Sequence, residues 1–178
     1  MATLKDIFEA KKTIGYFPGW SVPEQETDYI WFDAPIEIDG VTETGLVLHG
    51  GCFAHRPDVH VSFELRIART PGRQCIPIER FDWRSLEGGH SNPRKPRTEW
   101  SGRIVSDTHL HDFYLNWSDR EDRMRRGGLR FAREIEEEIQ DFAGIKDFSG
   151  KRLRINNIDV VEEPDWVYDL FTGGLSNG

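Results

Sequence analysis

Cysteine and long apolar runs are both scarce in this chain of 178 residues. Its two cysteines, Cys52 and Cys75, do not form a Cys-x-x-Cys pair, which argues against a zinc finger and leaves two free thiols as the expectation. No apolar stretch approaches the roughly 20 residues of a membrane helix. The first residues also lack the apolar segment of a signal peptide. We therefore expect a cytoplasmic protein without a membrane partner.

Motifs of several large enzyme classes are absent as well. The chain has no Gly-x-x-x-x-Gly-Lys-Ser/Thr loop for nucleoside triphosphates and no Gly-x-Ser-x-Gly elbow of the serine hydrolases. It also has no convincing Gly-x-Gly-x-x-Gly turn for dinucleotides. Any chemistry must therefore come from another set of side chains.

Charge is unevenly spread along the chain, whose formal net charge is -8. The centre, residues 55–133, carries 16 Lys and Arg against 11 Asp and Glu, and it holds five of the six histidines. Both ends are acidic. A basic centre favours an anionic ligand, so RNA or DNA is the expected partner there. The acidic, aromatic segment 162–171 is the expected contact for a protein partner.

The hydrophobic pattern predicts one α+β domain over residues 1–178, built on a mainly antiparallel sheet of about five to seven strands. The clearest strand signal lies at 58–69, where apolar and polar residues alternate. One face of that strand must meet the core, and the other meets water or a ligand. Asp39-Gly40 is a tight-turn dipeptide between two strands. Further strands are expected at 28–38, 41–49, 74–83, 103–117 and 153–161.

Helical spacing is found in a few segments. Residues 4–12 indicate a short helix, with Thr3 and Asp6 as a capping pair. The pattern also predicts one long amphipathic helix over 129–143, closed by Gly144 as its C-cap. Short flanking helices are expected after the capping box at 118–121 and within 164–171. The apolar stripe of the long helix consists of Leu129, Ala132, Ile135, Ile139 and Phe142.

Histidines gather between positions 49 and 111, and three of them lie in the stretch from Asp82 to Trp117. His109 and His111 are two residues apart, so on a strand both rings point to the same face. His90, on the preceding loop, could close over them. These three rings are candidates for a divalent-metal site, with Asp82 or Asp112 orienting a ring. The alternative is a strand that merely carries two hydrogen-bonded histidines.

A second interpretation of the same residues needs no metal. His90, His109 and His111 could act as general acid and base on a phosphodiester, while nearby positive charge stabilises the transition state. Tryptophans in the same region, Trp83, Trp100 and Trp117, could stack on bases, although core packing is the ordinary role of a tryptophan. The candidates for binding phosphate or other parts of the substrate are Arg80, Arg84, Arg94, Arg97 and Asn92.

Three short motifs follow one another in this stretch. They are Arg80-Phe81-Asp82, His90-Ser91-Asn92-Pro93 and His109-Leu110-His111-Asp112-Phe113. In this order they resemble a family of small uncharacterised bacterial proteins with Arg-aromatic-Asp, His-x-Asn-Pro and His-Leu/Ile-His-x-aromatic motifs. The resemblance covers about residues 78–145. It implies an origin in mobile-element or toxin–antitoxin loci and draws attention to the three histidines.

Two functions follow from these observations. The first is a nucleic-acid-directed, RNase-like phosphodiesterase that uses the histidine cluster with arginine support. The alternative is a non-catalytic acidic binding or inhibitor protein of a mobile-element, antitoxin-like or anti-defence kind, in which the histidines are structural. Whether the protein is an enzyme stays open at this point, as does a divalent-metal cofactor.

Overall fold

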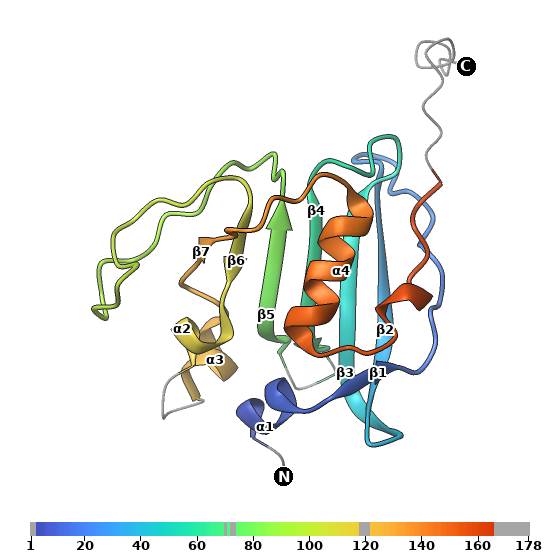
Figure 1. Cartoon of the computed structure of the whole chain (residues 1–178), viewed down its shortest axis with the longest axis horizontal. Helices are drawn as coiled ribbons and strands as arrows, with labels where there is room; N and C mark the ends of the chain where they lie inside the picture. Colours follow the sequence, from blue (N-terminus) through green and yellow to red (C-terminus); the bar gives the residue numbers. More distant parts are fainter. Residues whose placement is uncertain (1–2, 70, 72–73, 118–121, 166–178) are drawn as a thin grey trace.

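The computed structural model describes residues 3–69, 71, 74–117 and 122–165. Its centre is a seven-stranded antiparallel sheet in which the strands follow one another in sequence order (Figure 1). The predicted α+β class with a mainly antiparallel sheet is therefore confirmed. The strands are β1 (Lys12–Ile14), β2 (Tyr29–Ile38), β3 (Val41–Phe53), β4 (Val61–Ile67), β5 (Ile76–Trp83), β6 (His109–His111) and β7 (Arg133–Glu134).

The sheet follows from local sequence signals. Along β4, buried apolar residues alternate with half-buried polar ones, as the alternating pattern at 58–69 predicts. Asp39 and Gly40 both have positive φ, and Ile38 pairs with Val41, so the two residues form a tight turn between β2 and β3. That backbone suits Asp-Gly because glycine carries no Cβ and aspartate tolerates the left-handed region.

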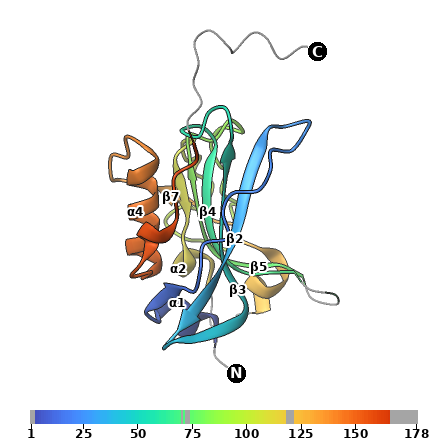
Figure 2. The ribbon, with the colours of Figure 1, turned by 90° about the vertical axis from the view of Figure 1, so that its right-hand side faces the viewer.

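The longest helix covers one face of this sheet. This helix, α4 (Phe142–Leu153), lies against β4 and β5 on one side of the sheet (Figures 1 and 2). Its Phe142 ring lies 5.8 Å from that of Phe63, and its Phe148 ring lies 5.5 Å from that of Phe81. The remaining helices are α1 (Leu4–Glu9), α2 (Phe113–Asn116), α3 (Asp122–Gly127) and the 3-10 turn η1 (Ile158–Val160).

The cap predicted for the N-terminal helix is confirmed. The Thr3 hydroxyl accepts from the Asp6 backbone N–H at 3.1 Å, and the Asp6 carboxylate accepts from the Thr3 N–H at 2.9 Å. This reciprocal pair satisfies two backbone donors that a helix start leaves open. None of the described helices combines the length and the apolar character needed to span a membrane.

The prediction of a long amphipathic helix over 129–143 is wrong. Arg133 and Glu134 instead pair with β6, and the helix begins only after Asp141, whose carboxylate accepts from the Gly144 N–H at 2.8 Å. Gly144 thus lies in the first turn of α4 rather than at a C-terminus. Hydrogen bonds from distant side chains hold the preceding backbone extended, and they outweigh local periodicity. The apolar residues of the expected stripe still contact the core, namely Leu129, Ile135, Ile139 and Phe142.

Two predicted strands also differ. Of the strand expected over 103–117, only β6 forms, because Asp112 caps α2 by accepting from the Leu115 N–H at 3.1 Å. The strand expected over 153–161 does not form, because this segment contains the end of α4 and then η1. The capping box predicted at 118–121 lies outside the described residues, as does most of the helix expected within 164–171.

Candidate functional site

Polar side chains form two cross-strand rows on the sheet face opposite α4. Because the strands are antiparallel, residues in register face the same side and are close neighbours. The first row joins Asp33, His49, Glu64, Arg80 and His111 across β2 to β6. The second row joins Ser62, Asp82, His109 and Glu134 across β4 to β7.

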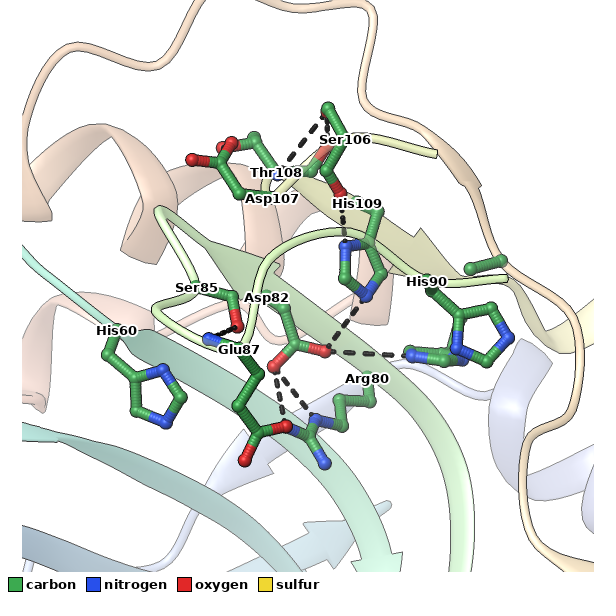
Figure 3. Close-up of polar contacts among 12 residues, drawn as sticks. His60, Arg80, Asp82, Ser85, Glu87, His90, Ser106, Asp107, Thr108 and His109 are labelled. Carbon is green, nitrogen blue, oxygen red and sulfur yellow. Dashed lines mark hydrogen bonds and ion pairs between the residues drawn. The ribbon is translucent and has the colours of Figure 1, made fainter. Parts of the chain in front are cut away.

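The two rows bring a carboxylate and two imidazoles together at β5 and β6. Asp82 Oδ2 lies 3.5 Å from His109 Nε2 and 3.7 Å from His111 Nε2. All three side chains are buried, and their ligand atoms lie within 4.8 Å of one another. We call Asp82, His109 and His111 the Asp-His cluster. Figure 3 shows Asp82 between Arg80 and His109.

Neighbouring groups fix the orientation of the Asp-His cluster. His109 Nδ1 lies 2.8 Å from the Ser106 carbonyl, so this nitrogen carries the proton of the neutral ring and Nε2 keeps its lone pair. Arg80 donates Nε–H and Nη2–H to Asp82 Oδ1 at 2.9 and 2.7 Å. The other carboxylate oxygen therefore faces the two rings. Arg80 thus holds Asp82, and its expected contact with phosphate stays a prediction.

Burial keeps both imidazoles neutral. Desolvation lowers the pKa of His111 to about 3, and the neighbouring His109 and His90 add to this shift. Desolvation also lowers the pKa of His109, although Asp82 and the Ser106 carbonyl act in the opposite direction. At neutral pH both rings therefore carry an unprotonated nitrogen. A neutral imidazole can accept a proton or bind a metal ion.

His90 joins the other two histidines from the loop after β5. Its ring centroid lies 4.7 Å from that of His111 and 6.0 Å from that of His109. Its Nε2–H donates to the Arg130 carbonyl at 2.9 Å. The three predicted histidines thus lie together. The remaining three, His49, His55 and His60, make their hydrogen bonds to Asp33, Asp28 and Leu86 and lie outside this group.

Asn92, a predicted substrate-binding residue, makes structural contacts. Its side chain is buried, its amide donates to the Ala132 carbonyl at 2.7 Å, and its oxygen accepts from the Ala132 N–H at 2.7 Å. Together with the bond between Val105 N–H and the His90 carbonyl, this pair fixes the loop beside β7. The polar atoms of Asn92 are therefore occupied by backbone.

The other predicted arginines do not contact the Asp-His cluster. Arg84 pairs with Asp58 at 3.2 Å and stacks on Trp83, while Arg94 and Arg97 are exposed on the long loop. Trp83 itself is buried on the α4 side, where its N–H donates to the Ile139 carbonyl. Among the described residues, these three arginines form no hydrogen bond or ion pair with Asp82, His109 or His111.

Sequence reasoning missed three polar residues beside the cluster. The Tyr29 hydroxyl lies 3.3 Å from the Ser62 hydroxyl, and Ser62 is directly opposite Asp82. Gly51 makes room for this ring, because a Cβ there would lie 2.1 Å from the Tyr29 hydroxyl. Glu64 lies in register with Arg80, and burial raises its pKa. The alternation in β4 indicated a polar face but could not say what it meets.

A basic cavity of about 820 Å³ is lined in part by Arg130, the residue whose carbonyl binds His90, and none of the described histidines lines it. Arg130 lines it while its carbonyl accepts from His90, so the two features share a backbone segment. Trp117 and Tyr114 supply aromatic walls, and the buried Trp117 N–H has no hydrogen-bond partner among the described residues. The cationic side chains among the described lining residues are Lys95, Arg123, Arg126 and Arg130.

The predicted protein-binding segment, 162–171, is described only to residue 165. In that part the Glu162 carbonyl accepts from the Trp20 N–H at 3.0 Å, and Glu163 lies 4.0 Å from Lys146. These contacts hold the segment against the fold. A protein partner at this end of the chain stays a prediction.

Comparison with known proteins does not identify a function for this site. The chain matches no model of a protein family, no curated protein and no solved structure. The resemblance of residues 78–145 to the bacterial family with the three motifs therefore stays a prediction. The arrangement of Asp82, His109 and His111, with His90 beside them, is the group of side chains that offers the most chemistry.

Proposed function

We propose that this protein is a nucleic-acid-directed phosphodiesterase, RNase-like in its use of histidines. The observation that carries the proposal is the convergence of two neutral imidazoles on the fixed carboxylate of Asp82. Groups that are buried, unprotonated and held in position by neighbours are typical of catalytic sites. His90 adds a third imidazole at the edge of the group, where its exposure is greater.

The chemistry of phosphodiester cleavage fits these groups. An attacking water or ribose hydroxyl must lose a proton, and the phosphorane-like transition state gains negative charge. A neutral imidazole can take up that proton, or it can bind a cation that stabilises the charge. Both uses depend on His109 and His111, so replacing them tests the function whichever applies.

The basic cavity supports a polyanionic substrate. Lys95, Arg123 and Arg130 line it, and its aromatic walls offer surfaces on which bases can stack. Since the Arg130 carbonyl also accepts from His90, a strand bound in the cavity would lie against the segment that holds His90. Lys95 lies on the same long loop as Arg94 and Arg97, so these exposed residues remain candidates for phosphate contacts.

Cleavage of end-labelled single-stranded RNA and DNA tests the proposal. The purified protein should cut at least one of them, and the variant H109A/H111A should lose about 100-fold or more of the rate. The matched control is H55A, because His55 is exposed and outside the cluster. Folding of each variant is verified by circular dichroism. Full activity in a folded H109A/H111A variant, or no cleavage of either substrate by the native protein, contradicts the proposal.

The substrate half of the proposal has its own variants. K95A and R130A remove positive charge from the cavity without touching the Asp-His cluster. Each variant should raise KM several-fold and leave kcat unchanged, because phosphate contacts stabilise the bound ground state and the transition state equally. The dependence of KM on salt concentration should weaken in both variants. If KM is unchanged at every salt concentration in both variants, the cavity does not bind the substrate.

A further inference from the structure

We infer that Asp82, His109 and His111 form a divalent-metal site with three protein ligands, with His90 outside the coordination set. This inference deepens the proposed function by naming the cofactor of the same cluster. Metal binding can be measured without any cleavage assay, so the two proposals fail separately.

The spacing within the Asp-His cluster is too long for good hydrogen bonds. Distances of 3.5 and 3.7 Å from Asp82 Oδ2 to the two Nε2 atoms exceed the 2.7–3.2 Å typical of N–H···O contacts. His109 Nε2 carries a lone pair, because its proton is on Nδ1 and donated to Ser106. A lone pair therefore faces a carboxylate oxygen. Such an arrangement is unfavourable unless a cation lies between the two groups.

The same spacing suits an ion. Ligand atoms at about 2.1 Å from a tetrahedral ion are roughly 3.4 Å apart. The two distances measured from Asp82 Oδ2 lie close to this value, and the three donor atoms are within 4.8 Å of one another.

Outer contacts of two of the three ligands match the pattern expected of a metal site. The Ser106 carbonyl fixes the tautomer of His109, and Arg80 fixes the carboxylate of Asp82. Metal-binding histidines commonly donate their second nitrogen to a carbonyl or carboxylate, and ligating carboxylates are themselves hydrogen-bonded. Strands β5 and β6 provide a rigid frame for all three ligands.

Three ligands of this kind select the class of ion. Two imidazoles and one carboxylate favour Zn²⁺ or another divalent first-row transition metal over Mg²⁺ and Ca²⁺, which prefer oxygen. A three-ligand set leaves positions for water and for a phosphate oxygen, and an ion bound there would lower the pKa of its water toward neutrality. His90, with its Nε2–H committed to Arg130, is then placed to exchange protons beside the ion.

Titration of metal-stripped protein with Co²⁺ and Zn²⁺ tests the inference. Calorimetry should give one equivalent per chain, and Co²⁺ should produce visible absorption bands typical of a nitrogen–oxygen site. D82N, H109A and H111A should each weaken binding by about 100-fold or more, and R80Q by about 10-fold through the loosened carboxylate. H90A should keep both the stoichiometry and the affinity. H55A is the matched surface control.

Melting temperature gives a second readout for variants with altered stability. Zn²⁺ should raise the melting temperature of the native chain and of H90A, but not that of folded D82N, because an ion that binds only the folded state stabilises it. The inference is overturned by weak binding of several equivalents, or by binding that D82N and H109A leave unchanged. Metal binding without nucleic-acid cleavage would uphold this site and remove the phosphodiesterase.

Discussion

Glu79 and Arg152 meet on the α4 face of the sheet, where Arg152 donates Nε–H to Glu79 Oε1 at 2.9 Å. Glu79 is fully buried, and its other oxygen has no hydrogen-bond partner among the described residues. Arg152 also donates to Asp112, the cap of α2, at 2.8 Å. The contact therefore links α4, β5 and the end of β6, which carries two residues of the Asp-His cluster.

The titration of Glu79 should make the stability of the protein depend on pH. Burial raises its pKa from 4.5 to about 8, against the attraction of Arg152. The folded state thus binds more protons than the unfolded state between these values, so the contribution is present at low pH and lost as pH rises toward 8. The difference in unfolding free energy between the native chain and E79Q, measured by urea unfolding, should change by at least about 2 kcal/mol from pH 5 to pH 8. Parallel profiles would contradict this, and E137Q, an exposed site, is the control.

Asn92 should matter for stability rather than for substrate binding. N92A leaves the buried N–H and carbonyl of Ala132 without their partners, which should cost about 2–4 kcal/mol of unfolding free energy. The Ala132 amide should also exchange its hydrogen faster. Urea titration measures the first effect and hydrogen exchange the second. S91A, at an exposed neighbour, should be neutral, and a change below about 0.5 kcal/mol in N92A would refute the assignment.

Two neighbouring glycines should respond differently to alanine. A Cβ at Gly50 would lie 2.2 Å from the Phe32 ring, which is buried in the core, whereas a Cβ at Gly51 meets the hydroxyl end of the half-buried Tyr29. Overpacking of a core costs about 1–3 kcal/mol, so G50A should melt well below G51A. G51A should instead displace the Tyr29 hydroxyl from Ser62 and alter cleavage more than stability. Equal melting temperatures would contradict this reading of the two faces.

Local signals in the sequence predicted a large part of the fold. The alternation in β4, the Asp39-Gly40 turn and the Thr3–Asp6 cap each depend on residues close together, and each is confirmed. The approach of His90 to His109 and His111 was predicted from the two-residue spacing of the strand histidines and from the place of His90 on the preceding loop.

Interactions over long sequence separations account for what was missed. The segment 129–134 has helical spacing, yet Asn92 and Asn116 bind its backbone and β6 pairs with it. No local pattern encodes those partners. The rows that place Ser62 opposite Asp82, and Arg80 opposite Glu64, depend on the register of β4 and β5. That register includes a shift near Leu65, which alternation alone cannot locate.

Lys12 should be one of the largest single contributors to stability. Its buried ammonium donates to the carbonyls of Phe8 and Ala10 at 2.8 Å and of Leu153 at 3.0 Å, so it satisfies the C-terminal ends of both α1 and α4. Burial lowers its pKa to about 8, which leaves it charged near neutrality. K12M keeps the length and apolar stem but leaves these carbonyls without a donor, and it should cost about 2–4 kcal/mol in urea unfolding at pH 7. K11M, at the exposed neighbour, should change little. If K12M is as stable as the native chain, the ammonium does not hold these two helix ends.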